Sequence, residues 1–282
     1  MKKTFDKNNI KIAAFDIDNT IFHEGRINEA VKESLIKLSN SGVTTVLATG
    51  RMHYGIPESI LDLGIFRYAV LANGAFLFDF EKQTSLSKRP FERSAADKVL
   101  RLVDSLTDAY FAAFESESIL TPKHLELLRR NIKLEVTKDG SPPVEIYSTY
   151  ENTLAHIAQM CEPIYKIGCR FDSVEKCAEA SLRIREECNF EVPSTDGKDL
   201  EINPLGIHKG SGTEILCDYL GRDISSVIAF GDSGNDVSLL ELAGFAVVVD
   251  NGQDSAKKVA DYIAPAVWED GVAKAIETLF KT

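Results

Sequence analysis

The feature that most constrains the fold is an alternation of short apolar runs with amphipathic stretches near both ends of the chain. Near the amino terminus, apolar runs predict strands at residues 10–15, 43–48 and 68–72. Between the first two, Val31, Leu35 and Leu38 have helical spacing and predict a helix that Asn28 can cap. Strands that alternate with helices form a parallel sheet covered on both faces, so the sequence predicts an α/β protein.

The last eighty residues repeat this alternation and are expected to complete the same sheet. Apolar runs there predict strands at 226–230, 245–249 and 262–264. Amphipathic stretches predict helices at 211–220, 237–243, 254–260 and 271–280. Gly221 follows the first of these helices and is a natural carboxyl-terminal stop.

The middle of the chain has a separate α/β pattern, which predicts a second unit inserted into the first. A capping-box pattern begins at Ser94 and precedes a helix with an apolar face. Further strands are predicted at 110–114, 144–147 and 165–171, and helices near 125–130, 152–160 and 174–187. The resulting domain prediction is a core of residues 1–83 and 193–282, with an inserted domain of residues 84–192.

Charge and cysteine content narrow the possible partners of this 282-residue chain. A net charge of −11 disfavours non-specific binding to nucleic acid and to anionic membranes, although local cations can still bind an anionic substrate. Five cysteines without C-x-x-C spacing favour free thiols over a zinc site or a disulfide framework. The polar amino terminus and the lack of a long apolar run predict a cytoplasmic protein without a signal peptide or membrane span.

Two aspartates at the end of the first predicted strand provide the strongest chemical signal. If the strand continued, the alternation of side chains would place Asp16 and Asp18 on the same side. Two close carboxylates repel each other unless a divalent cation lies between them or one of them is protonated. At the carboxyl end of a parallel strand they would face the usual ligand crevice. Taken alone, the motif is equally compatible with a solvated turn.

Two further motifs lie next to predicted strands or helices and contain residue types that can bind phosphate. Thr49, Gly50 and Arg51 follow the second strand, where a hydroxyl, a small residue and a guanidinium can approach an anion. Lys209 precedes a predicted helix, and its compact ammonium could hold phosphate and offset carboxylate charge. A lone lysine at such a position is more often solvated, so this motif has weight only in combination with the others.

A fourth motif, residues 230–236, lies between a predicted strand and a predicted helix. Asp232 could complete a metal site with Asp16 and Asp18, and oxygen ligands of this kind suit Mg²⁺. Asp236 could orient metal-bound water, and Asn235 could bridge phosphate and carboxylate. These residues could also cap the helix. All four motifs adjoin ends of predicted strands or helices around one candidate metal site, which is far less expected by chance than any one motif.

Together these motifs resemble those of the haloacid dehalogenase superfamily, and the insertion between the second and third resembles the large cap of its Cof-type branch (subclass IIB). The resemblance implies a Rossmann-like doubly wound parallel sheet core and an inserted α/β cap domain that selects the substrate. The segments at Asn73-Gly74-Ala75 and Asp270-Gly271 are also similar to that branch. Asn19 stands where the branch usually has glycine, and asparagine tolerates unusual backbone dihedrals. The stretch 247–252 also departs from the branch.

The activity implied by the resemblance is a Mg²⁺-dependent phosphatase that forms an aspartyl-phosphate on Asp16. Its substrate would be a small phosphorylated metabolite, such as a sugar phosphate or a related phosphomonoester, and Asp18 would act as general acid and base. The implied metal-binding residues are Asp16, Asp18 through its backbone carbonyl, Asp232, and Asp236 through water or a second shell. The implied phosphate- and substrate-binding residues are Thr49, Gly50, Arg51, Lys209 and Asn235.

Several alternatives stay open at the level of sequence. A phosphosugar mutase would share the phosphoaspartyl step, and a non-catalytic phosphometabolite-binding regulator or an interaction module could keep the fold. A dehalogenase is disfavoured, because its chemistry does not need this set of metal ligands. The substrate and the choice between a monomer and a small homo-oligomer are not determined. Possible cap contacts, each more often solvated surface, are His124, Arg129, Arg130, Lys166 and Arg170.

Overall fold

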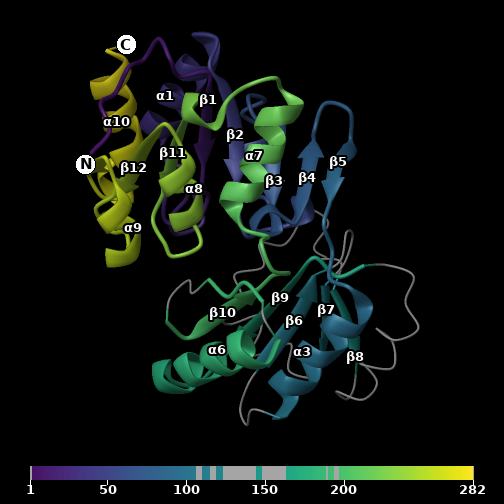
Figure 1. The fold of residues 1–282 in the computed structure, drawn as a ribbon. Coiled ribbons are helices and arrows are strands. Elements are labelled where there is room, and N and C mark those ends of the chain that lie inside the picture. Colours follow the sequence, from purple (N-terminus) through teal and green to yellow (C-terminus); the bar gives the residue numbers. More distant parts are fainter. Residues whose placement is uncertain are drawn as a thin grey trace. The chain divides into compact units, whose positions relative to one another are not determined.

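The computed structural model describes residues 2–105, 110–114, 119–122, 144–147, 163–188, 190–193 and 197–281. The chain divides into two compact units (Figure 1). The first unit comprises residues 1–50, 56–87 and 208–282, and the second comprises residues 51–55 and 88–207. The first unit is therefore built from both ends of the chain, as the repeated alternation of strands and helices predicted.

Within its described residues, the first unit contains an eight-stranded sheet. In spatial order the strands are β13 (Tyr262–Ala264), β12 (Phe245–Val249), β11 (Val227–Gly231), β1 (Ile12–Phe15), β2 (Thr44–Ala48), β3 (Tyr68–Leu71), β4 (Phe76–Asp79) and β5 (Thr84–Lys88). Neighbours from β13 to β3 are parallel, and β4 runs antiparallel to β3. The chain reverses direction across the sheet between β1 and β11, so their carboxyl ends meet at the switch point where α/β proteins bind ligands.

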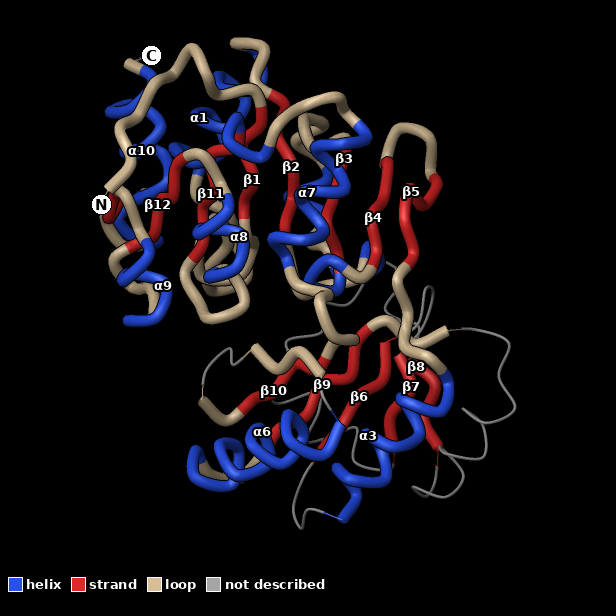
Figure 2. Tube along the Cα trace, viewed as in Figure 1, coloured by secondary structure: helices blue, strands red, loops and turns tan. Residues whose placement is uncertain are grey.

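Helices cover both faces of this sheet (Figure 2). On one face α1 (Glu29–Asn40) packs against α10 (Gly271–Phe280). On the other face α7 (Lys209–Tyr219), α8 (Val237–Leu242) and α9 (Asp254–Val259) lie in a row. A short helix, α2 (Glu58–Leu61), precedes β3. Burial on both faces explains why β1, β11 and β12 are continuously apolar rather than alternating.

The second unit, described by itself, contains a five-stranded sheet within its described residues. The order is β10 (Asp199–Ile202), β9 (Lys166–Arg170), β6 (Tyr110–Phe114), β7 (Ile119–Pro122) and β8 (Val144–Tyr147). Helices α3 (Arg93–Ser105) and α6 (Val174–Cys188) pack together, and their apolar faces share a buried core with β9 and β10. The helices predicted near 125–130 and 152–160 lie outside the described residues.

The structure confirms the predicted α/β fold class and corrects some boundaries. The predicted core segment 193–282 begins too early, because β10 pairs antiparallel with β9 and belongs to the second unit. Helix α7 begins at Lys209 rather than at Ser211, because the His208 side chain caps it by accepting from the Ser211 backbone N–H at 3.0 Å. Helix α3 begins one residue before the capping box predicted at Ser94.

None of the helices within the described ranges is long and apolar enough to cross a lipid bilayer.

Asn28 occupies the predicted amino-terminal cap position of α1, but its side chain does not cap the helix. Its amide instead donates to Asp270 Oδ1 at 2.8 Å. The position predicted from sequence is therefore right, whereas the bond made there connects α1 to the start of α10.

Candidate active site

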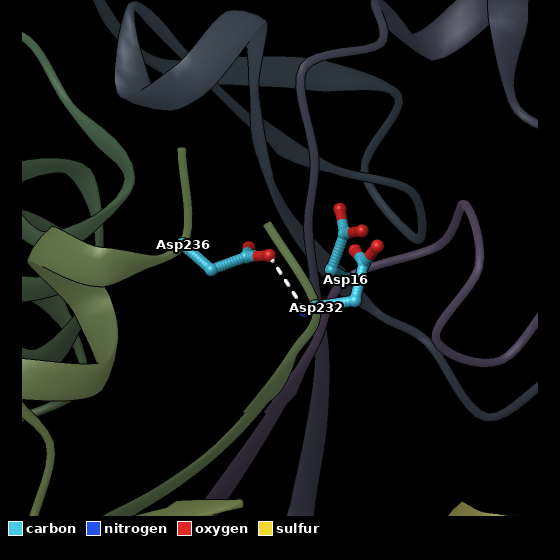
Figure 3. A group of neighbouring side chains, drawn as sticks. All are labelled: Asp16, Asp232 and Asp236. Carbon is cyan, nitrogen blue, oxygen red and sulfur yellow. Dashed lines mark hydrogen bonds between the residues drawn. The ribbon is translucent and has the colours of Figure 1, made fainter. Parts of the chain in front are cut away.

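Three buried carboxylates gather where β1 and β11 end and α8 begins (Figure 3). Asp16 directly follows β1, Asp232 directly follows β11, and Asp236 precedes α8. One carboxylate oxygen from each lies within 4.8 Å of the others. The Asp16 and Asp232 side chains lie next to each other, and Asp236 approaches from the side of α8. A backbone bond from the Asp16 N–H to the Phe230 carbonyl, at 2.9 Å, ties the two strand ends together.

Lys209 balances part of this negative charge. Its side chain is fully buried, and its Nζ donates to Asp16 Oδ1 at 2.7 Å and to Asp236 Oδ1 at 2.6 Å. The residue is brought there because it opens α7, whose first turn is fixed by the His208 cap. Lys209, which the sequence alone indicated only weakly, thus lies in direct contact with the carboxylate cluster.

The pKa values of the cluster reflect its burial first and the charges of its members second. Burial raises the pKa of Asp232, and the neighbouring carboxylates of Asp16 and Asp236 raise it further. Burial also raises the pKa of Asp16, although the Lys209 ammonium opposes that rise. For Lys209, burial favours a lower pKa, but Asp16 and Asp236 outweigh it and the pKa is raised. The ammonium therefore stays charged, whereas the Asp16 and Asp232 carboxyls bind protons more tightly than exposed carboxyls would.

Asp236 also organises the turn that bears Asp232. Its Oδ2 accepts the backbone N–H groups of Asp232 at 2.9 Å and Ser233 at 3.0 Å. With Oδ1 held by Lys209, both of its oxygens are engaged. Gly231 permits the close approach, because a Cβ there would lie 2.5 Å from the Asp236 carboxyl carbon. Asp236 is thus better suited to hold the site together than to serve as a primary metal ligand.

The turn after β1 separates Asp18 from the buried cluster. Asp18 is exposed, unlike the buried Asp16, and the described three-carboxylate group does not include it. The strand ends at Phe15, so the alternation of a continued strand does not apply. Asn19 has a φ of 57°, in the left-handed region, as expected for an asparagine in place of glycine. Asp18 therefore lies at the solvent-facing side of the turn.

The second motif contacts a segment that sequence analysis singled out only by resemblance. Thr49 is buried at the end of β2, and its carbonyl accepts the Asn73 N–H at 3.1 Å. Asn73 has a φ of 56°, and its Oδ1 accepts from the Asn235 Nδ2 at 3.3 Å. Asn235 is held on its other side by the Ser233 hydroxyl, which donates to Oδ1 at 2.9 Å. Thr49 and Asn235 are therefore linked through Asn73.

Fewer contacts are described for the remaining residues that were predicted to bind substrate. Gly50 is the last residue of the first segment of the first unit. Arg51 is the first residue of the short segment 51–55, which belongs to the second unit. The Arg51 guanidinium donates to the Gly55 carbonyl, so part of it holds a local turn. In the second unit Lys166 pairs with Glu201 at 2.5 Å and Arg170 with Asp199 at 2.6 Å. The other suggested cap contacts lie outside the described residues.

The donor set of the cluster fits a divalent metal. Three buried carboxylates face one buried ammonium, so two units of negative charge are uncompensated when all three acids are ionised. Oxygen-only donors are the ligands that hard cations such as Mg²⁺ prefer. Asp16 and Asp232 are the best candidates to hold it, because Asp236 already accepts three hydrogen bonds.

Three residues to which sequence reasoning assigned no role connect the motifs. Gln253 accepts from the Gly234 N–H at 3.1 Å, and the Thr20 hydroxyl donates to Asp232 Oδ1 at 3.4 Å. Asn73 joins two motifs as described above. Thr20 was visible as part of the first motif, but Gln253 had no recognisable local pattern because its partner lies nineteen residues away.

Comparison with known proteins finds phosphatases that are similar to this chain in sequence or in fold. The chain is 23% identical to 5-amino-6-(5-phospho-D-ribitylamino)uracil phosphatase YwtE of Bacillus subtilis (strain 168), over 96% of this chain and 98% of the relative. It is also 23% identical to pyridoxal phosphate phosphatase YbhA of Escherichia coli (strain K12), over 94% of this chain and 97% of the relative. The solved HAD subclass IIB sugar phosphatase BT4131 matches with a TM-score of 0.82 at 19% identity, covering 96% of this chain and 100% of that one.

The family comparison covers nearly the whole chain. A family model described as haloacid dehalogenase-like hydrolase matches residues 13–276, which include the four motifs and the second unit. Phosphotransferases of this superfamily generally use a divalent metal, in agreement with the charge of the cluster. The protein therefore belongs to the haloacid dehalogenase-like hydrolases, and the predicted Cof-type branch is confirmed.

Proposed function

We propose that the protein is a Mg²⁺-dependent phosphatase that hydrolyses a small phosphorylated metabolite through an aspartyl-phosphate on Asp16. The observation that carries the proposal is the buried carboxylate cluster around Lys209 at the switch point of the sheet. A buried nucleophile next to a fixed cation can attack an anionic phosphate, and a carboxylate nucleophile divides hydrolysis into two easier steps.

In the first step an Asp16 carboxylate oxygen attacks phosphorus, and the bond from phosphorus to the leaving oxygen breaks. Lys209 holds the carboxylate by Oδ1, which leaves Oδ2 as the attacking atom. Asp18 donates a proton to the leaving oxygen, a role that suits its exposed position in the turn directly after the nucleophile. In the second step Asp18 takes a proton from water, the water attacks phosphorus, and inorganic phosphate leaves Asp16 free.

Other residues of the motifs would hold the transferring phosphoryl group. We assign this role to the Thr49 hydroxyl, the Gly50 backbone, the Lys209 ammonium and the Asn235 amide, with Arg51 as a further substrate contact. Asp16, Asp232 and the Asp18 carbonyl would hold Mg²⁺, with Asp236 acting through water or through its backbone contacts. When bound, Mg²⁺ would offset the repulsion between the anionic nucleophile and the anionic substrate.

The substrate class follows from chemistry shared by the relatives. One named relative acts on a phosphorylated ribitylamino uracil, another on pyridoxal phosphate and a third is a sugar phosphatase. A small phosphomonoester with a polar, hydroxylated or heterocyclic leaving group is therefore the proposed class. We propose that the second unit, which includes most of residues 84–192, is the cap that selects among such substrates.

The proposed setting is the cytoplasm, as a monomer or a small homo-oligomer that binds neither nucleic acid nor membranes. The net charge of −11 supports this, because an acidic surface is repelled by both polyanions and anionic lipids. The thiols of Cys169, Cys188 and Cys217 are free, as suits a reducing compartment.

The experiment that tests the proposal measures phosphate release from a panel of phosphorylated metabolites, with Mg²⁺ or with a chelator. We expect release that requires Mg²⁺ and that Asp16→Asn abolishes, since an amide cannot form the acyl phosphate. Retained turnover in a folded Asp16→Asn protein would disprove the nucleophile assignment. Transfer of phosphate between two positions of a sugar without release would favour the phosphosugar mutase, and Mg²⁺ binding without turnover would favour a regulator.

A further inference from the structure

The loop between β12 and α9 contacts the turn that bears Asp18, the proposed acid and base, and the turn that bears Asp232, a proposed metal ligand. Asn251 Nδ2 donates to the Asn19 carbonyl at 2.9 Å, in the turn that carries Asp18. Asn251 Oδ1 accepts the Val267 N–H at 2.7 Å, which holds the amide from the other side. Both ends of this side chain are therefore fixed, and its donor end is aimed at the Asp18 turn.

Gln253 makes the equivalent connection to the turn that carries Asp232. Its backbone N–H donates to the Asp232 carbonyl at 2.7 Å, and its Oε1 accepts the Gly234 N–H at 3.1 Å. Gln253 occupies the amino-terminal cap position of α9, but its side chain makes no cap hydrogen bond there. The chain thus uses this side chain to hold the Asp232 turn instead of its own helix.

The order of strands explains why one loop can reach both turns. In the sheet β11 lies between β12 and β1, so a loop that follows β12 must cross the end of β11 to reach the turn after β1 (Figure 1). Strands are about 4.8 Å apart, so the span from β12 to β1 is about 10 Å. Gly252 permits the crossing, because a Cβ there would lie 2.9 Å from the Asp232 carbonyl oxygen.

The residue that receives the Asn251 bond, Asn19, directly follows Asp18 and is held by further contacts. Asn19 is in the left-handed region, with its N–H bonded to the Phe22 carbonyl at 2.8 Å. Its side-chain Oδ1 lies 3.2 Å from His23 Nδ1. Asp18 directly precedes Asn19 and is exposed, so its orientation depends on how the Asn19 peptide is held.

We infer that Asn251 and Gln253 are positioning residues that hold the Asp18 turn and the Asp232 turn at a fixed separation. Asn251 acts on proton transfer through the Asn19 carbonyl, and Gln253 acts on metal binding through the Gly234 and Asp232 backbone. The inference rests on the proposed roles of Asp18 and Asp232. It assigns a function to Asn251, in the stretch 247–252 that departs from the pattern of the Cof-type branch, and to Gln253 directly after that stretch.

Asn251→Asp is the informative variant for the first connection. It keeps the acceptor for the Val267 N–H but places a carboxylate oxygen against the Asn19 carbonyl, so the turn must move. We expect kcat to fall about ten-fold with KM within about two-fold, because a displaced acid impairs chemistry without removing a substrate contact. An equal loss from Asp250→Asn would overturn the inference. This control, on the neighbouring residue of the same loop, removes only a partly exposed ion pair with Lys257.

Gln253→Ala tests the second connection, and Gln253→Glu serves as its rescue. Alanine removes the acceptor for the Gly234 N–H, whereas glutamate keeps one. We expect the alanine variant to need about ten-fold more Mg²⁺ for half-saturation, measured by calorimetry, with most of the affinity restored by glutamate. A purely structural role predicts lower thermal stability with unchanged Mg²⁺ affinity, and that result would contradict the inference.

Amide hydrogen exchange tests the inference without any turnover. Asn251→Asp should speed exchange in a peptide covering residues 17–23 and leave residues 227–231 unchanged, whereas Asp250→Asn should change neither. If the wild-type protein released no phosphate but these exchange differences appeared, the proposed function would fail while the positioning contact stood. Unchanged exchange at 17–23 in an active enzyme would overturn the inference and leave the phosphatase intact.

Discussion

Lys209 is fully buried, although it is charged, and it donates hydrogen bonds to both Asp16 and Asp236. A buried charge is tolerated only when it is paired, and here each partner depends on the same ammonium. Removing the lysine leaves buried carboxylates without their cation, which costs more than losing an exposed pair.

We therefore expect Lys209→Met to lower the free energy of unfolding by about 3–5 kcal/mol in the presence of a chelator. Phosphate release should also be lost, because the variant no longer holds Asp16. Denaturant titration would measure the stability change. Lys257→Met removes a partly exposed ion pair with Asp250 and should cost at most about 1 kcal/mol. Similar losses in the two variants would show that burial of the cluster contributes little.

At the scale of elements, the approach of the 72–74 turn to α7 joins two parts of the site. Gly74 has a φ of 98°, and a Cβ there would lie 2.3 Å from the His208 carbonyl oxygen. The same turn carries Asn73, which connects Thr49 to Asn235. The close contact therefore determines where the first turn of α7, with Lys209, lies relative to the second motif.

Gly74→Ala should destabilise the protein more than Gly42→Ala, although both glycines have positive φ. Gly42, with a φ of 92°, has open space where a Cβ would be, so its cost is limited to about 1–2 kcal/mol of backbone strain. Gly74→Ala adds about 1–3 kcal/mol of steric displacement to the same strain. Chemical denaturation of both variants checks this, and equal losses would mean that the 72–74 turn can move away from α7 at little cost.

The turn after β4 depends on an acid whose pKa is lowered. Burial favours a higher pKa for Asp79, but hydrogen bonds from the Lys82 N–H, Arg67 and the Glu81 N–H outweigh it. Because the pKa in the folded state lies below the unfolded value, the ionised acid stabilises the protein above the unfolded pKa, and this contribution is lost as pH falls through the folded pKa.

Asp79→Asn should consequently destabilise the protein at neutral pH, with a difference from the wild type that shrinks as pH falls below about 4. Thermal unfolding of the two proteins between pH 3 and pH 7 would measure it. Asp62→Asn, directly after the short helix α2 rather than in this turn, removes one carboxylate elsewhere and serves as the control. A difference that grows toward acid pH would contradict the assignment.

At the scale of the whole molecule, metal binding should stabilise the first unit. When all three acids are ionised, two units of uncompensated negative charge are buried between segments from opposite ends of the sequence. A ligand that binds only the folded state adds stability according to its concentration relative to its dissociation constant. Magnesium would therefore connect the activity of the site to the assembly of the core.

We expect Mg²⁺ at one hundred times its dissociation constant to raise the free energy of unfolding by about 2.7 kcal/mol over the chelator-treated protein. Asp232→Asn should remove most of this gain, because it replaces a proposed ligand with a neutral amide. Differential scanning calorimetry with and without Mg²⁺ checks both statements. An equal Mg²⁺ effect in Asp232→Asn would mean that the cation binds elsewhere.

Local pattern was enough to predict much of the first unit. The strand over 245–249, the short strand over 262–264 and the helix over 271–280 have the predicted bounds, since buried strands and amphipathic helices have characteristic periodicities. The left-handed conformation of Asn19 was also expected from its residue type. Asp16, Lys209, Asp232 and Asp236 could be singled out from the sequence, because their motifs adjoin the ends of predicted strands or helices and together suit one metal site.

Other features depended on partners far away in the sequence. Nothing local marks residues 199–202 as a strand of the second sheet, since that depends on pairing with β9 about thirty residues earlier. The exposure of Asp18 follows from where β1 ends, and the bond from Asn251 to Asn19 joins residues 232 positions apart. The sequence by itself thus determined the element types and the chemical groups, through short-range periodicity and residue chemistry. Only the tertiary structure decided which groups meet, because hydrogen bonds and burial there depend on contacts that distant segments make.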